Sequence, residues 1–143
     1  MSGAMLDRRD VVRVLLTDRG DLLVIAGLGA PAWDVTAAGD SPHNLPLWGG
    51  MGGAAMVGLG LALAQPHRRV LVITGDGEIL MGLGALATIG TVRPRNLAVV
   101  ALDNERYGET GGQETATAAG ADLAAVARGC GIADVCTITT MDE

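Results

Sequence analysis

Apolar residues gather in short runs along the chain, and these runs alternate with segments of helical character. A continuous run of about four to eight apolar residues between turn residues is typical of a strand that is buried on both faces of a sheet. The pattern predicts strands over residues 21–26, 44–48, 69–74, 96–102 and 135–139.

Segments with helical spacing or helix-end signals separate these strands. Residues 7–19 have an amphipathic pattern in which Asp7 can cap the first turn. Residues 103–120 have no apolar period, so we predict one long loop there. The other predicted helices span residues 31–38, 51–65, 78–91 and 122–130.

The alternation of strands and helices predicts an α/β fold. Strands that are continuous apolar runs belong to parallel sheets with helices on both faces. We expect one doubly wound domain over residues 1–143, because no linker, repeat or low-complexity tract divides the sequence. Ligands in such folds bind beyond the carboxyl ends of the strands. The loops after residues 26, 48, 74 and 102 should therefore share one edge of the sheet.

Composition narrows the function classes. The formal net charge is −6, and the ten basic residues are all arginines without a basic run, which disfavours a nucleic-acid or anionic-membrane surface. The longest apolar run, residues 49–64, is rich in glycine and too short for a membrane span, so it predicts a buried helix. Cys130 and Cys136 match no zinc or redox spacing, and the N-terminus has no apolar leader. We expect reduced core thiols in a cytoplasmic protein.

Candidate chemistry begins at the turn Gly75-Asp76-Gly77, which joins a predicted strand directly to a predicted helix. The glycines allow a bulky anion to approach the backbone, where the first N–H groups of the helix can bind it. A carboxylate such as Asp76 beside a phosphate site indicates a cation between the two, typically Mg²⁺. Asn104 follows after one helix and one strand, so it should reach the same edge of the sheet and offer a second oxygen ligand.

The Gly-Asp-Gly turn, the crossover and the strand-ending asparagine together resemble the signature of thiamine diphosphate-binding proteins. The resemblance implies that Asp76, Asn104 and the backbone carbonyl of Arg106 bind Mg²⁺. Asp103 stands where this family usually has a second asparagine, a mild departure because the following residue is the ligand.

A second match lies in the segment LWGGMGGAAMVGLG, where the family has a large apolar residue between glycines at the entrance to a helix. The resemblance implies that Met51 supports the bent cofactor and that the Gly49 carbonyl accepts a hydrogen bond from its amino group. Glu78 departs from the common Ser or Ala, and we expect its charge to point away from the diphosphate. The implied cofactor-binding residues are Gly27, Gly29, Gly49, Gly50, Met51, Gly75, Asp76, Gly77, Glu78, Asn104, Arg106, Tyr107 and Gly108.

A finer resemblance covers residues 22–132 and includes LMGLGALATIG and the TGGQ loop. These segments are similar to the β subunits of sulfopyruvate and phosphonopyruvate decarboxylases. The resemblance implies the diphosphate-binding half of a split 2-oxoacid decarboxylase. A partner chain would then carry the pyrimidine-binding domain and its catalytic glutamate. Tyr107, Glu109 and Gln113 are the candidates for substrate contact.

Other interpretations stay open on the residues alone. The same cofactor serves carboligases of the acyloin and acetolactate type. The segment from Gly27 to Ala32 fits a dinucleotide-binding pattern, but Pro31 removes a backbone donor and no acid ends the next strand. Asp76 and Asn104 could be turn residues only, in a non-catalytic scaffold that binds a partner.

Overall fold

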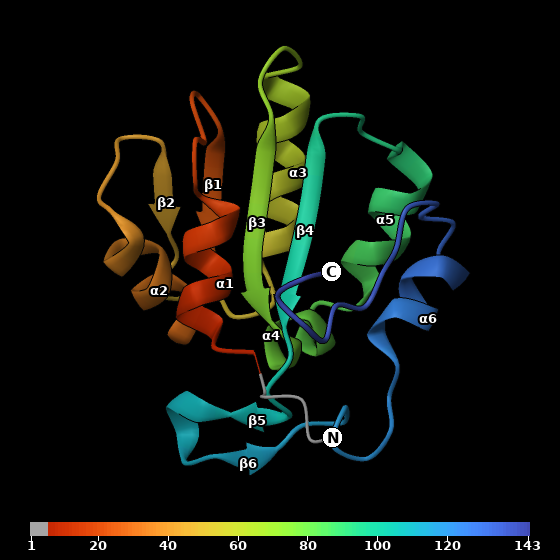
Figure 1. The fold of residues 1–143 in the computed structure, drawn as a ribbon. Helices are drawn as coiled ribbons and strands as arrows, with labels where there is room; N and C mark the ends of the chain where they lie inside the picture. Colours follow the sequence, from red (N-terminus) through yellow and green to blue (C-terminus); the bar gives the residue numbers. More distant parts are fainter. Residues whose placement is uncertain (1–5) are drawn as a thin grey trace.

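Four parallel strands form the sheet at the centre of the protein, of which the computed structural model describes residues 6–143 (Figure 1). They are β1 (Leu23–Ala26), β2 (Asn44–Pro46), β3 (Val70–Gly75) and β4 (Leu97–Leu102). Their order is β2-β1-β3-β4, so the chain steps outward from β1 to β2 and then returns to the other side of β1. The carboxyl ends of β1 and β3 therefore flank the point where the topology switches, which is where such folds bind ligands.

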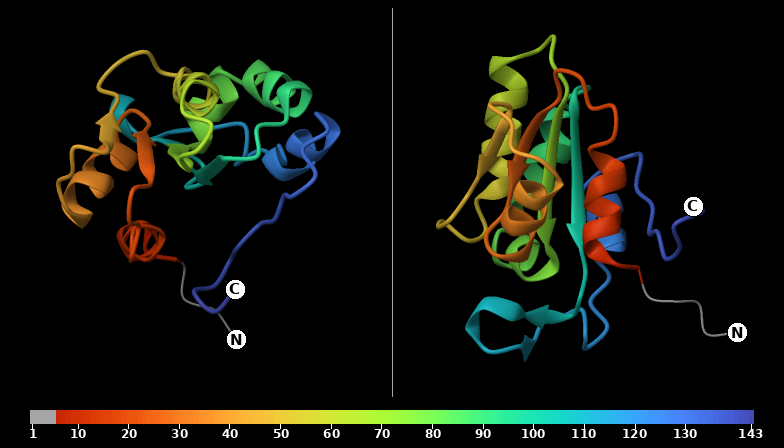
Figure 2. Two further views of the ribbon diagram at one scale, coloured as in Figure 1. Left: turned by 90° about the horizontal axis from the view of Figure 1, so that it is seen from above. Right: turned by 60° about the vertical axis from the view of Figure 1, so that its left-hand side comes forward.

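Helices cover both faces of this sheet, as Figure 2 shows. The doubly wound α/β class predicted from the sequence is confirmed. On one face lie α1 (Arg8–Leu15) and α2 (Ala30–Ala38). On the other face lie α3 (Ala54–Ala64) and α5 (Gly84–Val92), with α6 (Leu123–Gly129) packed on α5. The short α4 (Asp76–Met81) follows β3 without an intervening loop.

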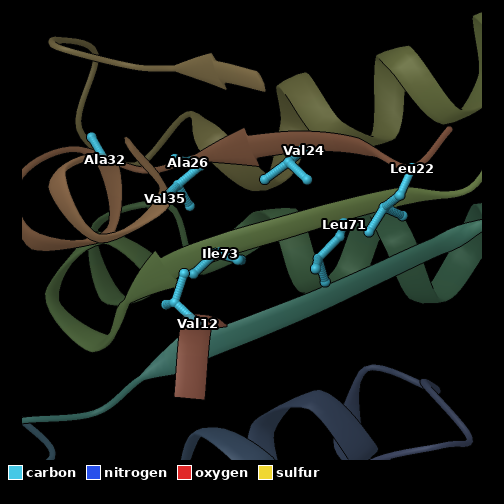
Figure 3. Packing of buried hydrophobic residues seen from close by; sticks show 8 residues of the cluster. All are labelled: Val12, Leu22, Val24, Ala26, Ala32, Val35, Leu71 and Ile73. Carbon is cyan, nitrogen blue, oxygen red and sulfur yellow. The ribbon is translucent and has the colours of Figure 1, made fainter. Parts of the chain in front are cut away.

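Side chains of β3 alternate between the two cores. Leu71 and Ile73 join the cluster that contains Val12 of α1 and Val35 of α2 (Figure 3). Val70 and Val72 point to the opposite side, where they meet α3. This alternation follows from the two-residue period of a strand, and burial on both faces explains why the strand is a continuous apolar run.

The glycine-rich segment at residues 49–64 forms a turn followed by α3. Gly50 and Gly52 have φ values of +66° and +95°, so the helix begins after them and not at residue 51. Within α3, a Cβ on Gly58 would lie 2.2 Å from a methyl carbon of Val72, so the helix can approach β3 only with glycine at this position. Among the described residues, no helix is both long and apolar enough to span a membrane.

The single helix predicted over residues 78–91 is wrong, because the structure has two helices with a break between them. The first helix ends at Met81, and Gly82 is its C-cap. A Cβ on Gly82 would lie 2.1 Å from the carbonyl oxygen of Gly52. The break therefore coincides with a tertiary contact to the turn before α3, and Gly82 and Gly84 within the predicted helix were a local signal of a helix end.

The strand predicted over residues 135–139 is also wrong, because the described structure has no strand there. Its β-branched residues favour a strand locally, but a strand also needs a hydrogen-bonded neighbour. Ile138 is 53 % exposed. Cys136 is exposed and Cys130 is half-buried, so the expectation of two core thiols is wrong for Cys136; both are free cysteines.

The long loop predicted over residues 103–120 contains ordered structure that the prediction missed. It forms an antiparallel hairpin of β5 (Arg106–Tyr107) and β6 (Gln113–Glu114), connected through the 3-10 helix η1 (Gly108–Thr110). Gly111 and Gly112 make the turn with φ values of +114° and +76°. Figure 1 shows this hairpin beyond the carboxyl ends of β3 and β4.

Candidate functional site

A cavity of about 1290 Å³ opens at the carboxyl end of the sheet and continues along β4 toward α1 and the last residues of the chain. The structure brings most of the predicted site residues to its wall. Gly27, Gly29, Gly49, Gly50 and Gln113 are not on this wall. The predicted residues that line it are Met51, Gly75, Asp76, Gly77, Glu78, Asn104, Arg106, Tyr107, Gly108 and Glu109.

Asp76 begins α4 directly after β3 and is 1 % exposed. Its Oδ2 accepts hydrogen bonds from the hydroxyls of Thr115 at 2.6 Å and Thr117 at 3.2 Å. Within residues 6–143, no hydrogen bond ends on its other carboxylate oxygen. Two hydroxyls therefore fix the orientation of the carboxylate and leave Oδ1 available to a ligand.

A second carboxylate shares this network. The Thr117 hydroxyl also lies 2.9 Å from Asp103 Oδ1, so Asp76 and Asp103 share the single proton of one hydroxyl. Neither carboxylate forms an ion pair with any residue in the described part of the chain. This local excess of negative charge and oxygen donors suits a hard divalent cation such as Mg²⁺.

Asn104 lies in the turn that follows β4. Its side-chain oxygen accepts a hydrogen bond from Arg106 N at 3.1 Å, while Asp103 Oδ1 accepts one from Glu105 N at 3.0 Å. Glu105 has a φ of +60°, in the left-handed region. These consecutive side chain-to-backbone bonds fix the turn and hold the Asn104 oxygen close to the backbone of the predicted ligand Arg106.

The side chain of Arg106 is used within the hairpin, which leaves its backbone carbonyl as the predicted ligand. The guanidinium pairs with Glu114 across the hairpin at 3.2 Å. The neighbouring carbonyls of Glu105 and Tyr107 accept hydrogen bonds from Thr115 N at 3.0 Å and Gly112 N at 2.9 Å. Since carbonyls alternate along a strand, that of Arg106 points away from the hairpin partner.

Tyr107 both packs and lines the cavity. A Cβ on Gly77 would lie 2.5 Å from ring carbon Cε1 of Tyr107 and 2.7 Å from Cδ1, so an edge of the ring packs against the Gly-Asp-Gly turn. Gly29 also needs its small size, because a Cβ there would lie 2.7 Å from Glu109 Cγ. Glu109 thus connects the hairpin side of the cavity to the loop after β1.

Gln113 does not face the cavity. Its amide oxygen accepts from the Thr110 hydroxyl at 2.9 Å, and its amide nitrogen donates to the Thr110 carbonyl at 2.8 Å. These bonds close the hairpin turn. The structure therefore gives Gln113 a place in the hairpin, and its predicted substrate contact stays a prediction.

Glu78 is buried, with 3 % of its surface exposed, and its side chain turns toward the loop after β1 and the turn before α3. Gly49 and Gly50 lie in that exposed turn, next to the half-buried Met51. The predicted cofactor loops are thus in contact through Glu78.

Sequence reasoning missed Thr115 and Thr117. Both are buried, at 3 % and 8 % exposure, within a segment that was predicted to be an open loop. A signal was present, because alternate residues of an extended segment point to the same side. The Thr-Ala-Thr spacing after Gln113 and Glu114 could have predicted a pair of hydroxyls on one face.

This fold and site define a class: an α/β domain with an acidic cavity at its topological switch point. Comparison with known proteins identifies the family. Residues 29–143 match the family model described as "Thiamine pyrophosphate enzyme, C-terminal TPP binding domain". The chain therefore belongs to this family, which confirms the resemblance seen in its motifs.

Named relatives agree with the family model. The chain is 38 % identical to the sulfopyruvate decarboxylase subunit beta of Methanocaldococcus jannaschii, over 95 % of this chain and 72 % of that protein. It is 45 % identical to the subunit of the same name from Methanothermobacter thermautotrophicus, over 89 % and 68 %. The phosphonopyruvate decarboxylase of Streptomyces viridochromogenes is 42 % identical over 86 % of this chain and 30 % of its own length.

A solved structure shares the fold. An X-ray structure of a candidate thiamin diphosphate-dependent enzyme from Mycobacterium smegmatis superposes with a TM-score of 0.73. The match covers 90 % of this chain and 26 % of that one at 22 % sequence identity. At this identity the likeness concerns the fold alone.

Proposed function

We propose that this protein is the diphosphate-binding subunit of a thiamine diphosphate- and Mg²⁺-dependent 2-oxoacid decarboxylase. Its substrate is a small acidic 2-oxoacid of the sulfopyruvate or phosphonopyruvate type. One observation carries the proposal: Asp76, oriented by Thr115 and Thr117, shares a cavity wall with Asn104 and Met51. The names of the relatives support the choice of reaction.

In the proposed mechanism, the residues of this chain bind and orient the cofactor and its metal ion. Asp76, Asn104 and the carbonyl of Arg106 would hold Mg²⁺ through oxygen. The backbone after Gly75 would hold the diphosphate, and Met51 would support the bent form of the cofactor. When bound, thiamine diphosphate supplies the electron sink that makes loss of CO₂ from a 2-oxoacid possible.

A partner subunit completes the proposed enzyme. It would carry the pyrimidine-binding domain and the catalytic glutamate, so the active site would lie between two chains and this chain alone would be inactive. Two relatives are named as beta subunits, which supports such an arrangement. We place the complex in the cytoplasm, in agreement with the free thiols of Cys130 and Cys136.

The dinucleotide interpretation loses support in the structure. Gly27 and Gly29 face the carboxyl-bearing side chains of Glu78 and Glu109 at close range. The small size of these glycines therefore makes room for side chains of the protein, whereas the dinucleotide pattern uses it for the approach of a pyrophosphate to the backbone. The first turn of α2 also contains Pro31, which has no N–H to offer.

Native purification tests the proposal. The chain, isolated under mild conditions from its own cells, should bring a stoichiometric second chain and bound thiamine diphosphate. The complex should release CO₂ from sulfopyruvate or phosphonopyruvate. The assay is repeated with an added acceptor aldehyde. If the 2-oxoacid then gives a condensed product and releases no aldehyde of its own, the enzyme is a carboligase. A complex that binds no thiamine diphosphate at saturating Mg²⁺ would contradict the proposal.

A further inference from the structure

Glu78 is a buried carboxylate with no cationic partner in the described part of the chain. It accepts four hydrogen bonds instead. Oε2 accepts from the Thr74 hydroxyl at 2.8 Å and from Leu28 N at 3.1 Å. Oε1 accepts from Gly52 N and Ala54 N, each at 3.3 Å. Burial of a charge costs free energy unless hydrogen-bond donors surround it. These four hydrogen bonds therefore stabilise the carboxylate in its buried position.

The four donors come from three separate segments. Leu28 lies in the loop after β1, Thr74 near the end of β3, and Gly52 and Ala54 at the entrance to α3. Glu78 itself belongs to α4. One carboxylate therefore joins both sides of the topological switch point to the turn that carries Met51.

Neighbouring glycines make room for this side chain. A Cβ on Gly27 would lie 1.9 Å from Glu78 Oε2 and 2.7 Å from Thr74 Oγ1. A side chain at residue 27 would therefore displace the carboxylate. The contact of Gly82 with the Gly52 carbonyl brings the same turn against the end of α4.

Three features hold the turn that carries Met51: the bonds to Glu78, the packing of Gly52 against the end of α4, and a backbone hydrogen bond from Gly53 N to the Gly50 carbonyl at 2.9 Å. Gly50 and Gly52 flank Met51 and both have positive φ, so the local backbone preference is weak. Within residues 6–143, the only side-chain hydrogen bonds to residues 49–54 are those of Glu78. The position of Met51 relative to the Gly75–Gly77 turn thus depends on this carboxylate.

We propose that Glu78 is a positioning residue for thiamine diphosphate: it fixes the Met51 turn against the Gly75–Gly77 turn and so sets the affinity for the cofactor. The inference rests on the proposed function, because Met51 and Gly77 are residues that the proposal assigns to the cofactor. Glu78 acts through the backbone of these turns and has no chemical part in the reaction.

The first test measures cofactor binding by the native complex carrying E78Q. The substitution keeps the size of the side chain but places an NH₂ group against N–H donors. The dissociation constant for thiamine diphosphate at saturating Mg²⁺ should rise about tenfold or more, because buried donors lose their acceptor. With cofactor saturating, the KM for the 2-oxoacid should stay within about twofold. T74V removes one of the four donors and should weaken cofactor binding in the same direction by less.

Asn96 provides a matched control at the other end of α3. Its amide donates to the carbonyls of Ala62, Gln65 and Arg68 at 2.9–3.1 Å, so several hydrogen bonds join the start of β4 to the end of α3 and the loop that follows it. N96A should lower the Tm of the complex and leave the dissociation constant for thiamine diphosphate unchanged. Equal weakening by N96A and E78Q would show a general loss of stability and overturn the inference.

A second readout needs no cofactor. Trp48 lies just before the Met51 turn and makes an edge contact with Trp33 of α2, with ring centroids 4.9 Å apart. These are the two tryptophans of the chain. With this chain labelled by 5-fluorotryptophan, the ¹⁹F signal of Trp48 should shift or broaden in E78Q and stay in place in N96A. An unchanged Trp48 signal in E78Q would overturn the inference.

The outcomes separate this inference from the proposed function. If the wild-type complex binds no thiamine diphosphate, the proposed function fails and the inference fails with it. If the wild-type complex binds the cofactor and E78Q binds it equally well, the inference alone fails.

Discussion

Each end of α3 is fixed by a side chain that makes several hydrogen bonds to the backbone. The side chain at the start accepts these bonds, and the side chain at the end donates them. At its start, the Glu78 carboxylate accepts hydrogen bonds from two backbone N–H groups. At its end, the Asn96 amide donates to three backbone carbonyls. In both cases the side chain comes from another element of the fold, which makes the ends of the helix part of the tertiary structure.

Helix polarity explains which group stands at which end. The first turn of a helix presents unpaired N–H groups and the last turn unpaired carbonyls, so the start calls for an acceptor and the end for a donor. Only the Glu78 end borders the cavity that contains Asp76. Substitutions at this end should change ligand binding, whereas substitutions at the Asn96 end should change stability alone.

The largest effect is expected from Asp76→Ala at the carboxyl end of the sheet. The proposed metal would lose its strongest ligand, and CO₂ release should fall at least about a thousandfold, which corresponds to several kcal/mol. Steady-state assay of the native complex measures this. Asp10→Ala on the exposed side of α1 is the control and should keep wild-type activity. Retention of more than a tenth of the activity by Asp76→Ala would contradict the assignment of a metal site to the carboxyl end of the sheet.

Gly77→Ala should have the next largest effect. The new methyl group would meet the Tyr107 ring, and the overpacked hairpin should lower the free energy of unfolding by about 1–3 kcal/mol. Urea denaturation checks the loss. Tyr107→Ala combined with Gly77→Ala should cost less than the sum of the two single variants. Additive losses would show that the ring and the turn do not touch.

The fold followed from the sequence where local pattern and tertiary structure agree. Continuous apolar runs predicted β1 and β3 because these two strands are buried between two layers of helices. The outer strands β2 and β4 were predicted as well, although the structure leaves them half-buried or exposed. The break at Gly82 coincides with a contact to the Gly52 carbonyl, and residues 135–139 lack a strand partner in the described structure. Both errors arose where distant segments affect the local conformation.

A smaller effect is expected from Thr115→Val, which removes the shorter hydrogen bond to Asp76 while it keeps the shape of the side chain. Because this hydrogen bond no longer orients the Asp76 carboxylate, the complex should bind Mg²⁺ about tenfold more weakly. Titration with Mn²⁺, followed by electron paramagnetic resonance, measures the affinity. Thr91→Val on the exposed side of α5, where the hydroxyl binds only its own helix, should leave metal affinity unchanged. An equal effect of both variants would contradict a role for Thr115 at the metal.

The smallest effects should come from the middle of α3, between the two ends. Gly58→Ala would meet Val72 and should destabilise the protein by about 1 kcal/mol. Gly60→Ala has nothing within 4 Å and should stabilise it by about 0.5–1 kcal/mol, because alanine is the better helix former. Thermal unfolding of both variants checks the opposite signs. Shifts of the Tm in the same direction for both variants would show that the contact of Gly58 with β3 does not determine the effect of an added methyl group on stability.

The candidate site was only partly readable from the sequence. Asp76 and Asn104 could be named because they end neighbouring parallel strands, where the topology brings them to one edge. The hydrogen-bond partners of Glu78 and Asp76 could not be predicted, because Leu28 and Thr115 lie far from them in the sequence. Hydrogen bonds between distant loops leave no periodic pattern in a sequence.

Binding of thiamine diphosphate to the native complex decides whether the acidic end of this sheet is a cofactor site. Calorimetric titration in the presence of Mg²⁺ should give one cofactor for each copy of this chain. The binding should be lost on removal of Mg²⁺ with a chelator and in the Asp76→Ala complex. Binding that is equally tight in the Asp76→Ala complex, or no binding to the wild-type complex, would contradict the account.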